Sequence, residues 1–347
     1  MAETMRAAVL HGVDDLRVED VPRPTITDPN QALVRVRSVG ICGSDVHYFK
    51  RGRIGNFVVE SPMILGHEAA GEIVEVGANV AHLQPGQRVA IEPGYPDRTC
   101  RFCREGRYNL CPDVTFLATP PVDGAFAELL AWPSDYLHPL PDSVSLDEGA
   151  MVEPLSVGIH AIRQTGLRPG QAVAIMGAGP IGLCTLAVAL AAGATTAIIT
   201  DSVPLRLQMA EQMGATHVLE VGPENVEQIM AITGGDGVDV ACECAGAVPA
   251  IATALQVTRS GGFVQLVGMP AETHPPVAIY ELIGRELSVG GLFRYCNTYP
   301  AGISLIERGA VDVKPLVTHH FDLEQAPAAM AWVDENKETV IKAVVHP

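Results

Sequence analysis

The residues best suited to chemistry in this chain are a thiol, an imidazole and two carboxylates. They lie in three separate stretches, as Cys42, the pair His67 and Glu68, and Glu153. One thiolate, one imidazole and one carboxylate suit a borderline-soft cation such as Zn²⁺. Three protein ligands leave a fourth position for water or substrate, as in catalytic zinc sites. Taken alone, Cys42 has an ordinary alternative, because a single cysteine is often a small core residue.

The segment after Cys42 carries further polar groups. If it becomes helical, Ser44 and His47 are three residues apart and share a face. A hydroxyl and an imidazole on one face could pass a proton away from a metal. Asp45 could accept a hydrogen bond from a ligand imidazole and fix its tautomer. The alternative is a polar cap, with Ser44 or Asp45 at the N-terminus of a short helix.

A second cluster has the spacing of a zinc lobe. Cys100 and Cys103 form a Cys-x-x-Cys pair, and Cys111 follows nearby. Four thiolates would close a structural tetrahedron, but here Asp97 stands where an evenly spaced fourth cysteine would fall. The cluster therefore either binds a structural zinc through Asp97 or is a lobe that has lost its metal.

A glycine-rich turn marks a nucleotide site. The apolar strand 172–176 leads directly into Gly177-Ala178-Gly179-Pro180-Ile181-Gly182, which opens a helix. An acidic residue, Asp201, closes the next strand roughly 20 residues further on, which completes the dinucleotide fingerprint. The candidate cofactor-binding residues are Gly177, Gly179, Pro180, Ile181, Gly182, Asp201 and Arg206. Asp201 favours NAD over NADP by repelling a 2′-phosphate, whereas Arg206 could accommodate that phosphate.

Elements that position these groups follow from the patterning. Residues 156–295 alternate strands and helices and predict an α/β fold with a doubly wound, six-stranded parallel sheet. Ligands bind at the carboxyl ends of such strands, so we expect two backbone segments near the nicotinamide half of the cofactor. They are Cys244, Ala245 and Gly246, and Val267, Gly268 and Met269. Residues 1–155 predict a β-rich domain, and we expect 296–347 to complete it. His319 and His320 show no thiol or carboxylate partner, so we do not expect them to bind metal.

Charge and hydropathy limit the kinds of partner and location that we expect for this protein. The 347-residue chain has a formal net charge of −17, which argues against nucleic acid as a partner. No apolar run of about 18 residues predicts a membrane span. No signal peptide is visible at the N-terminus, so we expect a cytoplasmic protein.

The order of these motifs resembles the zinc-dependent medium-chain dehydrogenases over nearly the whole chain. It is similar in particular to the polyol branch, which includes sorbitol (L-iditol 2-) and xylitol dehydrogenases. The matching stretches are Gly40–Tyr48, Arg51–Gly55, Glu92–Gly94, Tyr108–Pro112, Glu153–Val157 and Phe293–Tyr295. The departure is Asp97, where many members have the first lobe cysteine.

The resemblance implies a GroES-like catalytic domain, a Rossmann domain and commonly a homotetramer. It implies that Cys42, His67 and Glu68 bind the catalytic zinc, with Glu153 either ligating the metal or holding its water. The implied catalytic residues are Ser44, His47, Glu153 and Arg294. The implied substrate-binding residues are Tyr48, Phe116, Glu153 and Arg294, with Arg294 close enough to pair with Glu153. The implied metal groups are Cys42, His67, Glu68 and Glu153 for the catalytic zinc, and Asp97, Cys100, Cys103 and Cys111 for a structural zinc.

The expected activity is oxidation of a secondary alcohol in a polyol to the ketose, dependent on NAD and zinc, and the reverse. One alternative is a zinc dehydrogenase of another secondary alcohol, such as a sugar-phosphate polyol, threonine or butanediol. A second alternative is an NAD-binding structural protein whose catalytic site has decayed. A decayed site should have lost ligands, and none of the four catalytic candidates is missing.

Overall fold

The chain folds into two compact units in the computed structural model, which describes residues 3–272 and 274–347. The first unit consists of Met1–Glu153, Tyr299–Arg308 and Val313–Pro347. The second consists of Pro154–Thr298 and Gly309–Asp312.

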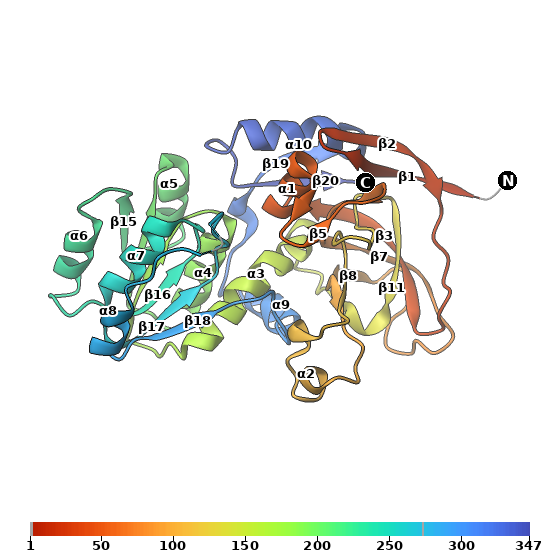
Figure 1. Cartoon of the computed structure of the whole chain (residues 1–347). Coiled ribbons are helices and arrows are strands. Elements are labelled where there is room, and N and C mark those ends of the chain that lie inside the picture. Colours follow the sequence, from red (N-terminus) through yellow and green to blue (C-terminus); the bar gives the residue numbers. More distant parts are fainter. Residues whose placement is uncertain (1–2, 273) are drawn as a thin grey trace. The chain divides into compact units, whose positions relative to one another are not determined.

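A seven-stranded sheet is the frame of the first unit (Figure 1). Its main path runs β12 (Leu137–Pro139), β8 (Arg88–Ile91), β7 (Glu68–Val76), β3 (Gln31–Gly40), β20 (Lys342–His346) and β19 (Val317–Asp322). The strand β11 (Leu129–Pro133) pairs with β3. Because β20 pairs with β3, the C-terminal segment is part of the same sheet as the N-terminal strands. A separate sheet joins β1 (Thr4–Gly12), β2 (Asp15–Pro22) and β6 (Met63–Ile64).

Helix α1 (Gly43–Arg51) begins where β3 ends, and its sequence sets both of its ends. Asp45 lies in the first turn, and Lys50 and Arg51 lie in the last, which complements the helix dipole. Gly52 stops the helix with φ +65°, a left-handed conformation that glycine adopts without strain. The remaining helices of this unit are α2 (Arg101–Arg104), α9 (Tyr299–Glu307) and α10 (Ala326–Glu335).

Short elements complete the first unit. They are β4 (Arg53–Ile54), β5 (Phe57–Val58), β9 (Gly94–Tyr95) and β10 (Thr115–Phe116), with 3₁₀ turns at Tyr108–Leu110, Ser134–Tyr136, Lys314–Leu316 and Leu323–Gln325. Helix α3 (Leu146–Thr165) begins in the first unit and continues into the second.

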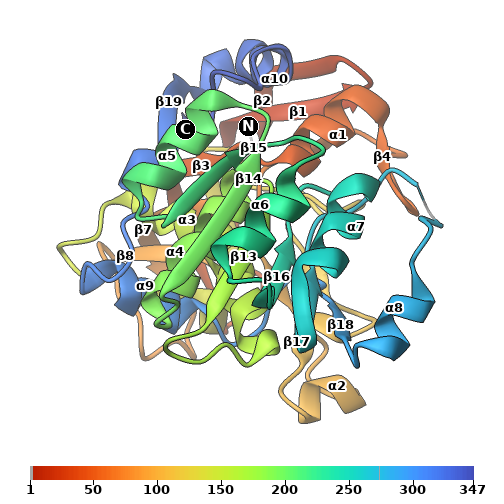
Figure 2. The same cartoon turned by 90° about the vertical axis from the view of Figure 1, so that its left-hand side faces the viewer.

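The second unit is built on a six-stranded parallel sheet in the order β15-β14-β13-β16-β17-β18 (Figure 2). The strands are β13 (Ala172–Met176), β14 (Thr196–Asp201), β15 (His217–Glu220), β16 (Val238–Glu243), β17 (Thr258–Leu266) and β18 (Ser288–Gly291). The helices between them are α4 (Pro180–Ala191), α5 (Pro204–Gln212), α6 (Asn225–Ile232), α7 (Val248–Val257) and α8 (Ile279–Gly284). The predicted fold class, a β-rich domain with a doubly wound parallel sheet, is confirmed.

Burial explains why the second sheet is so apolar. Val173, Ala174 and Ile175 of the central strand β13 are each 0 % exposed, as expected for parallel strands covered on both faces. In the residues that the structure describes, no helix has both the length and the apolarity needed to cross a bilayer.

Candidate active site

Three predicted metal ligands meet in the first unit. A ligand atom from each of Cys42, His67 and Glu68 lies within 4.8 Å of the other two. Cys42 follows β3, and His67 and Glu68 stand at the start of β7, whose pairing sets Glu68 opposite Gly40. The approach is close, since a Cβ at Gly40 would lie 2.1 Å from a Glu68 oxygen. Adjacent antiparallel strands thus bring together residues 25 positions apart.

The groups around His67 create a negative environment that favours a bound cation. Burial disfavours the imidazolium, but the negative charges of Cys42, Asp45 and Glu153 outweigh it and raise the pKa of His67 to about 10. Buried negative groups are costly unless a cation or hydrogen bonds balance them. One sulfur, one nitrogen and one carboxylate oxygen therefore form a donor set that fits Zn²⁺.

Asp45 holds the backbone around the site. Its carboxylate accepts hydrogen bonds from the Cys42 N–H at 2.9 Å and the Gly66 N–H at 3.0 Å. Asp45 therefore does cap the helix, as one alternative from the sequence predicted. The N-cap residue itself is Cys42, and Asp45 completes the capping box from the third helical position. Asp45 lies 3.8 Å from His67 Nδ1, beyond direct hydrogen-bonding distance. Its contribution to His67 is therefore the field of its charge.

Lys342 is a member of the site that the motifs did not indicate. Its Nζ lies 2.7 Å from both carboxylate oxygens of Glu68 and 3.1 Å from the Ile41 carbonyl oxygen. Both side chains are almost fully buried, at 3 % and 1 % exposure. The negative groups around it, Glu68 first, raise the pKa of Lys342 despite its burial. The available signal was a lone lysine directly before the apolar residues 343–345 of the C-terminal strand.

Helix α1 carries the other predicted polar groups. Ser44 is half-buried, His47 is exposed and Tyr48 is buried. Lost hydration, together with the positive charges of Arg51 and Lys337, lowers the pKa of His47, which favours the neutral imidazole that can accept a proton. The Phe116 ring lies 5.8 Å from the His67 ring, centroid to centroid, and is buried.

The two remaining predicted residues belong to different units. Glu153 is 5 % exposed in α3 and is the last residue of that stretch of the first unit. Arg294 follows β18 in the second unit and has an unusual left-handed backbone at φ +53°. Its guanidinium carbon lies 4.9 Å from the centre of the Phe293 ring, within cation–π range.

A cavity of about 770 Å³ lies at the carboxyl ends of the strands of the second unit. Four predicted cofactor residues line it, Gly177, Gly179, Asp201 and Arg206. Gly177 has φ +97°, and a Cβ on Gly182 would lie 1.8 Å from the Gly177 oxygen, so this turn requires both glycines. The cavity has the place and the lining expected of a dinucleotide site.

Asp201 is held firmly in this cavity. Its carboxylate accepts N–H bonds from Ala178 at 2.7 Å and Val203 at 2.9 Å. Arg206 approaches the same carboxylate at 3.7 Å. The Asp201 carboxylate is therefore fixed beside the glycine turn, and the Arg206 guanidinium lies close to it.

The other predicted cofactor residues lie around the cavity. Pro180 and Ile181 open α4, whose N-cap is Gly179. Val267, Gly268 and Met269 are outside the cavity lining. Gly268 and Met269 lie close to Gly246, and a Cβ on Gly268 would be 2.2 Å from the Gly246 nitrogen. The Val267 N–H donates to the Glu243 carbonyl oxygen at 2.8 Å. The sequence did not indicate the lining residues that follow β15, which are Val221, Gly222 and Pro223 of the loop and Asn225 at the start of α6.

The cysteine lobe also forms a cluster. Ligand atoms of its members all lie within 4.8 Å of one another, from Asp97, Cys100, Cys103 and Cys111. Lost hydration and the neighbouring Cys100 thiol raise the pKa of Cys103 to about 12. Asp97 also accepts N–H bonds from Thr99 and Cys100, which orient its carboxylate toward the thiols. Three sulfurs and one oxygen fit the tetrahedral set of a structural zinc.

Family models match both units. An alcohol dehydrogenase GroES-like domain matches residues 28–142, and a zinc-binding dehydrogenase domain matches residues 180–308. Sorbitol dehydrogenase of Bacillus subtilis is 48% identical over 346 residues, which cover 99% of this chain and 98% of that protein. The chain belongs to the zinc-dependent medium-chain dehydrogenases. It is an oxidoreductase that depends on NAD and zinc.

Two further relatives resemble this dehydrogenase over most or all of its length. Human sorbitol dehydrogenase is 48% identical over 321 residues, which cover 92% of this chain and 89% of that protein. The solved L-idonate 5-dehydrogenase from Escherichia coli superposes with a TM-score of 0.93 at 30% identity and covers 100% of this chain and 99% of its own. The likeness extends through both units.

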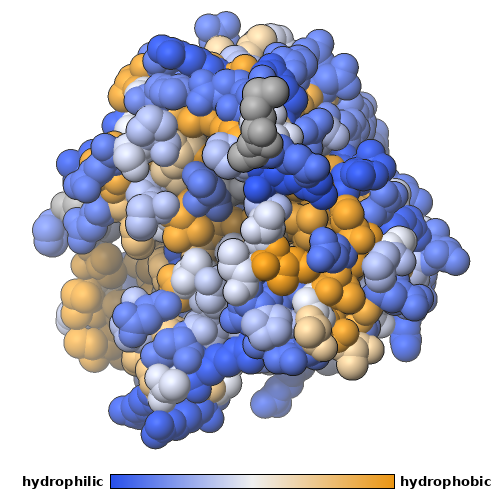
Figure 3. All heavy atoms as spheres, turned by 90° about the vertical axis from the view of Figure 1, so that its right-hand side faces the viewer, coloured by the Kyte–Doolittle hydropathy of each residue, from blue (hydrophilic) through white to orange (hydrophobic). Residues whose placement is uncertain are grey.

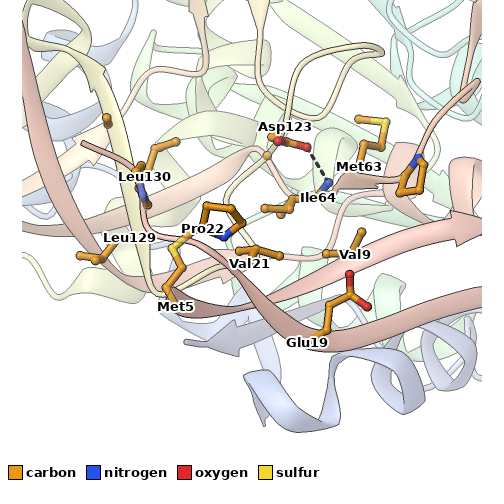
Figure 4. Close-up of a pocket in the computed structure, with 14 residues that line it drawn as sticks. Met5, Val9, Glu19, Val21, Pro22, Met63, Ile64, Asp123, Leu129 and Leu130 are labelled. Carbon is orange, nitrogen blue, oxygen red and sulfur yellow. Dashed lines mark hydrogen bonds between the residues drawn. The ribbon is translucent and has the colours of Figure 1, made fainter. Parts of the chain in front are cut away.

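The medium-chain dehydrogenase has another cavity, of about 440 Å³, in its first unit (Figure 4). It is lined mainly by apolar side chains of β1, β2, β6 and β11, and its lining includes no cysteine or histidine. Asp123 accepts the Ile64 N–H at 2.9 Å and so holds the backbone there. Seen from the side of the N-terminal strands, hydrophobic side chains gather in patches between hydrophilic ones (Figure 3). The lining therefore lacks the thiol and imidazole donors that the Cys42 cluster has.

Cofactor choice in this dehydrogenase should depend on the charge of Asp201. Asp201→Asn keeps an oxygen acceptor but removes the charge that repels a 2′-phosphate and pairs with Arg206. We expect the ratio of kcat/KM with NAD to that with NADP to fall about 10- to 100-fold, the size of a lost charged hydrogen bond. Steady-state kinetics with both cofactors measure the ratio. Glu220→Gln is the control, since this exposed residue pairs with Asp201 in the sheet outside the cavity. An unchanged ratio in Asp201→Asn would refute the role.

The lobe should hold one zinc that depends on Asp97. We expect zinc analysis to give one ion fewer per chain for Asp97→Ala than for the parent, because a three-sulfur site lacks its fourth ligand. Asp97→Cys should keep the ion. Asp113→Asn is the matched control, an exposed acid in the same loop outside the cluster. Equal zinc content in Asp97→Ala and the parent would show that Asp97 is no ligand.

Proposed function

We propose that this dehydrogenase oxidises a secondary hydroxyl of a polyol, such as sorbitol or xylitol, to the ketose with NAD, and catalyses the reverse. The observation that carries the proposal is the 48% identity to sorbitol dehydrogenase across 99% of the chain, with every predicted ligand present. The alternative of a decayed site is disfavoured because Cys42, His67 and Glu68 converge.

In this proposal Cys42, His67 and Glu68 hold the catalytic zinc. When bound, zinc supplies a Lewis acid that lowers the pKa of a hydroxyl, and NAD supplies the hydride acceptor. Lys342 holds the Glu68 carboxylate in place through two hydrogen bonds, and a carboxylate has lone pairs enough to bind a metal as well. The negative charge of Glu153 acts on His67. Glu153 would orient the water or the substrate hydroxyl at the coordination position that the three protein ligands leave free.

The proton of the substrate hydroxyl would leave along α1 or through Glu153 and water. Ser44 can both accept and donate a proton, and His47, three residues on, is neutral and exposed. His47 would then release the proton to solvent. A relay of this kind typically contributes about 10²- to 10⁴-fold to the rate.

Recognition of the polyol would come from polar groups around an apolar wall. Phe116, buried beside His67, would form that wall. Tyr48, Glu153 and Arg294 would hydrogen-bond the neighbouring hydroxyls. A site built for hydroxyls rejects analogues that lack them by about 10⁴-fold.

The cofactor would occupy the cavity of the second unit. Gly177, Gly179 and the start of α4 at Pro180 would cradle the pyrophosphate, and Asp201 would bind the adenosine ribose. We further propose that residues 1–155 with 296–347 act as the zinc domain and 156–295 as the NAD domain. A cytoplasmic homotetramer is proposed as well, by resemblance to the family.

A substrate panel tests the proposed function. NADH formation is measured with sorbitol, xylitol, galactitol, threonine, 2,3-butanediol and ethanol. We expect kcat/KM for the best polyol to exceed that for ethanol by about 10⁴-fold. A higher kcat/KM for threonine or butanediol than for every polyol would replace the proposed substrate class.

A further inference from the structure

Two histidines and an aspartate cluster in the first unit, apart from the groups already described. His346 Nε2 lies 2.9 Å from Asp147 Oδ1, and His320 Nδ1 lies 3.6 Å from Asp147 Oδ2. A ligand atom of each residue lies within 4.8 Å of the other two. The Ser38 hydroxyl donates to Asp147 Oδ1 at 2.7 Å. The expectation that His320 lacks a carboxylate partner was wrong, because α3 supplies one from elsewhere in the sequence.

Sheet register places the two imidazoles on one face. In the parallel pair β19–β20, His320 stands opposite Val344 and Asp322 opposite His346. Because residues two apart on a strand share a face, His320 and His346 point to the same side. Their rings are stacked, with centroids 5.4 Å apart and planes at 27°.

Helix α3 and strand β3 add the oxygen groups. Asp147 lies in the first turn of α3, and Ser38 lies near the end of β3, beside β20. The Ser38 bond fixes the carboxylate, as partners of metal ligands commonly do. The adjacent His319 is not part of this cluster. Its ring packs against Trp332, with the two ring centroids 4.6 Å apart.

The donor set is chemically suited to a divalent transition metal. Two imidazole nitrogens and one carboxylate oxygen suit Zn²⁺. Zinc–ligand bonds of about 2.0–2.2 Å in a tetrahedron put donor atoms roughly 3.3–3.5 Å apart. Here each imidazole faces a different oxygen of Asp147, His346 at 2.9 Å from Oδ1 and His320 at 3.6 Å from Oδ2. The side chains of Asp147, His320 and His346 are 31%, 51% and 37% exposed, so an ion can enter and keep a water.

We propose that Asp147, His320 and His346 form a binding site for Zn²⁺, distinct from the Cys42 cluster and the cysteine lobe. The ion would join the beginning of α3 to β19 and β20, which are remote in sequence. Because such a site exists only in the folded chain, binding stabilises that state. The same helix α3 carries Glu153 further along, so the ion would also fix the start of the element that presents Glu153.

Zinc content of the whole protein tests the proposal. The zinc-loaded protein is dialysed to equilibrium against buffered Zn²⁺, and bound metal is measured per chain. We expect His320→Ala to bind about one zinc fewer than the parent and to lose the rise in Tm that added Zn²⁺ gives the parent. His11→Ala is the matched control, because it removes an imidazole paired with a single carboxylate, Glu19, at 3.1 Å. Equal zinc content in His320→Ala and the parent would overturn the proposal.

A spectroscopic measurement keeps the test independent of stability. Cu²⁺ is added to the zinc-loaded protein, where it can displace Zn²⁺ from this site because imidazole and carboxylate donors bind Cu²⁺ more tightly. Electron paramagnetic resonance then counts the nitrogen ligands. We expect two imidazole nitrogens at one site in the parent and a loss of that signal in both His320→Ala and His346→Ala. A copper spectrum that neither substitution changes would overturn the proposal even if a variant folds poorly.

Discussion

Replacing Cys42 by alanine is expected to lower kcat/KM for polyol oxidation by at least about 10³-fold. The substitution removes the only sulfur among the three clustered donors, and a metal's polarising effect is worth several kcal/mol at about 1.36 kcal/mol per tenfold in rate. Zinc content should fall by about one ion per chain. Stability should change less than activity, because Cys42 is only half-buried.

Cys184→Ala is the matched control for this result. Cys184 is fully buried in α4 of the second unit and belongs to neither thiol cluster. We expect its variant to keep full zinc content and kcat/KM close to that of the parent. Retention of more than about a tenth of the parent activity in Cys42→Ala would mean that Cys42 does not hold the metal needed for the reaction.

Replacing Lys342 by methionine is expected to cost about 3–5 kcal/mol of the free energy of unfolding and most of the activity. The change leaves the Glu68 carboxylate buried without its cation, and breaking one half of a buried pair typically costs this much. Denaturant unfolding measures the stability, and NADH formation measures the activity. Since the pKa of Lys342 is raised, its stabilising contribution is complete at neutral pH and is lost only as pH rises above the usual lysine range.

Two companions separate the pair from a general effect of losing a lysine. Lys337→Met removes an exposed lysine paired with Asp334 and should cause a much smaller loss of stability. Adding Glu68→Leu to Lys342→Met removes the orphaned charge and should recover part of the stability but none of the activity. If Lys342→Met were as stable as Lys337→Met, the buried pair would not be important for folding.

The features that could be predicted from the sequence are those that depend on local patterns of residues. The turn from Gly177 to Gly182 and the cluster around Cys100 and Cys103 depend on neighbours in sequence, so their spacing carried the information. The parallel sheet followed for the same reason, because each strand and helix carries its own periodicity. Cys42 and His67 could be grouped only with help from the family resemblance.

Long-range register explains what the sequence could not supply. Lys342 reaches Glu68 because β20 inserts beside β3, a pairing between residues about 300 positions apart. His320 and His346 meet Asp147 for the same kind of reason. Charge inside an apolar strand was a usable sign for Lys342, whereas exposed histidines give no such sign.

The most direct test of the account is NADH formation from sorbitol by one preparation in three states. The protein is assayed as purified, after complete zinc removal by chelator with circular dichroism showing that it remains folded, and after Zn²⁺ is added back. We expect activity to disappear in the second state and to return in the third. Activity that survives complete zinc removal would contradict it.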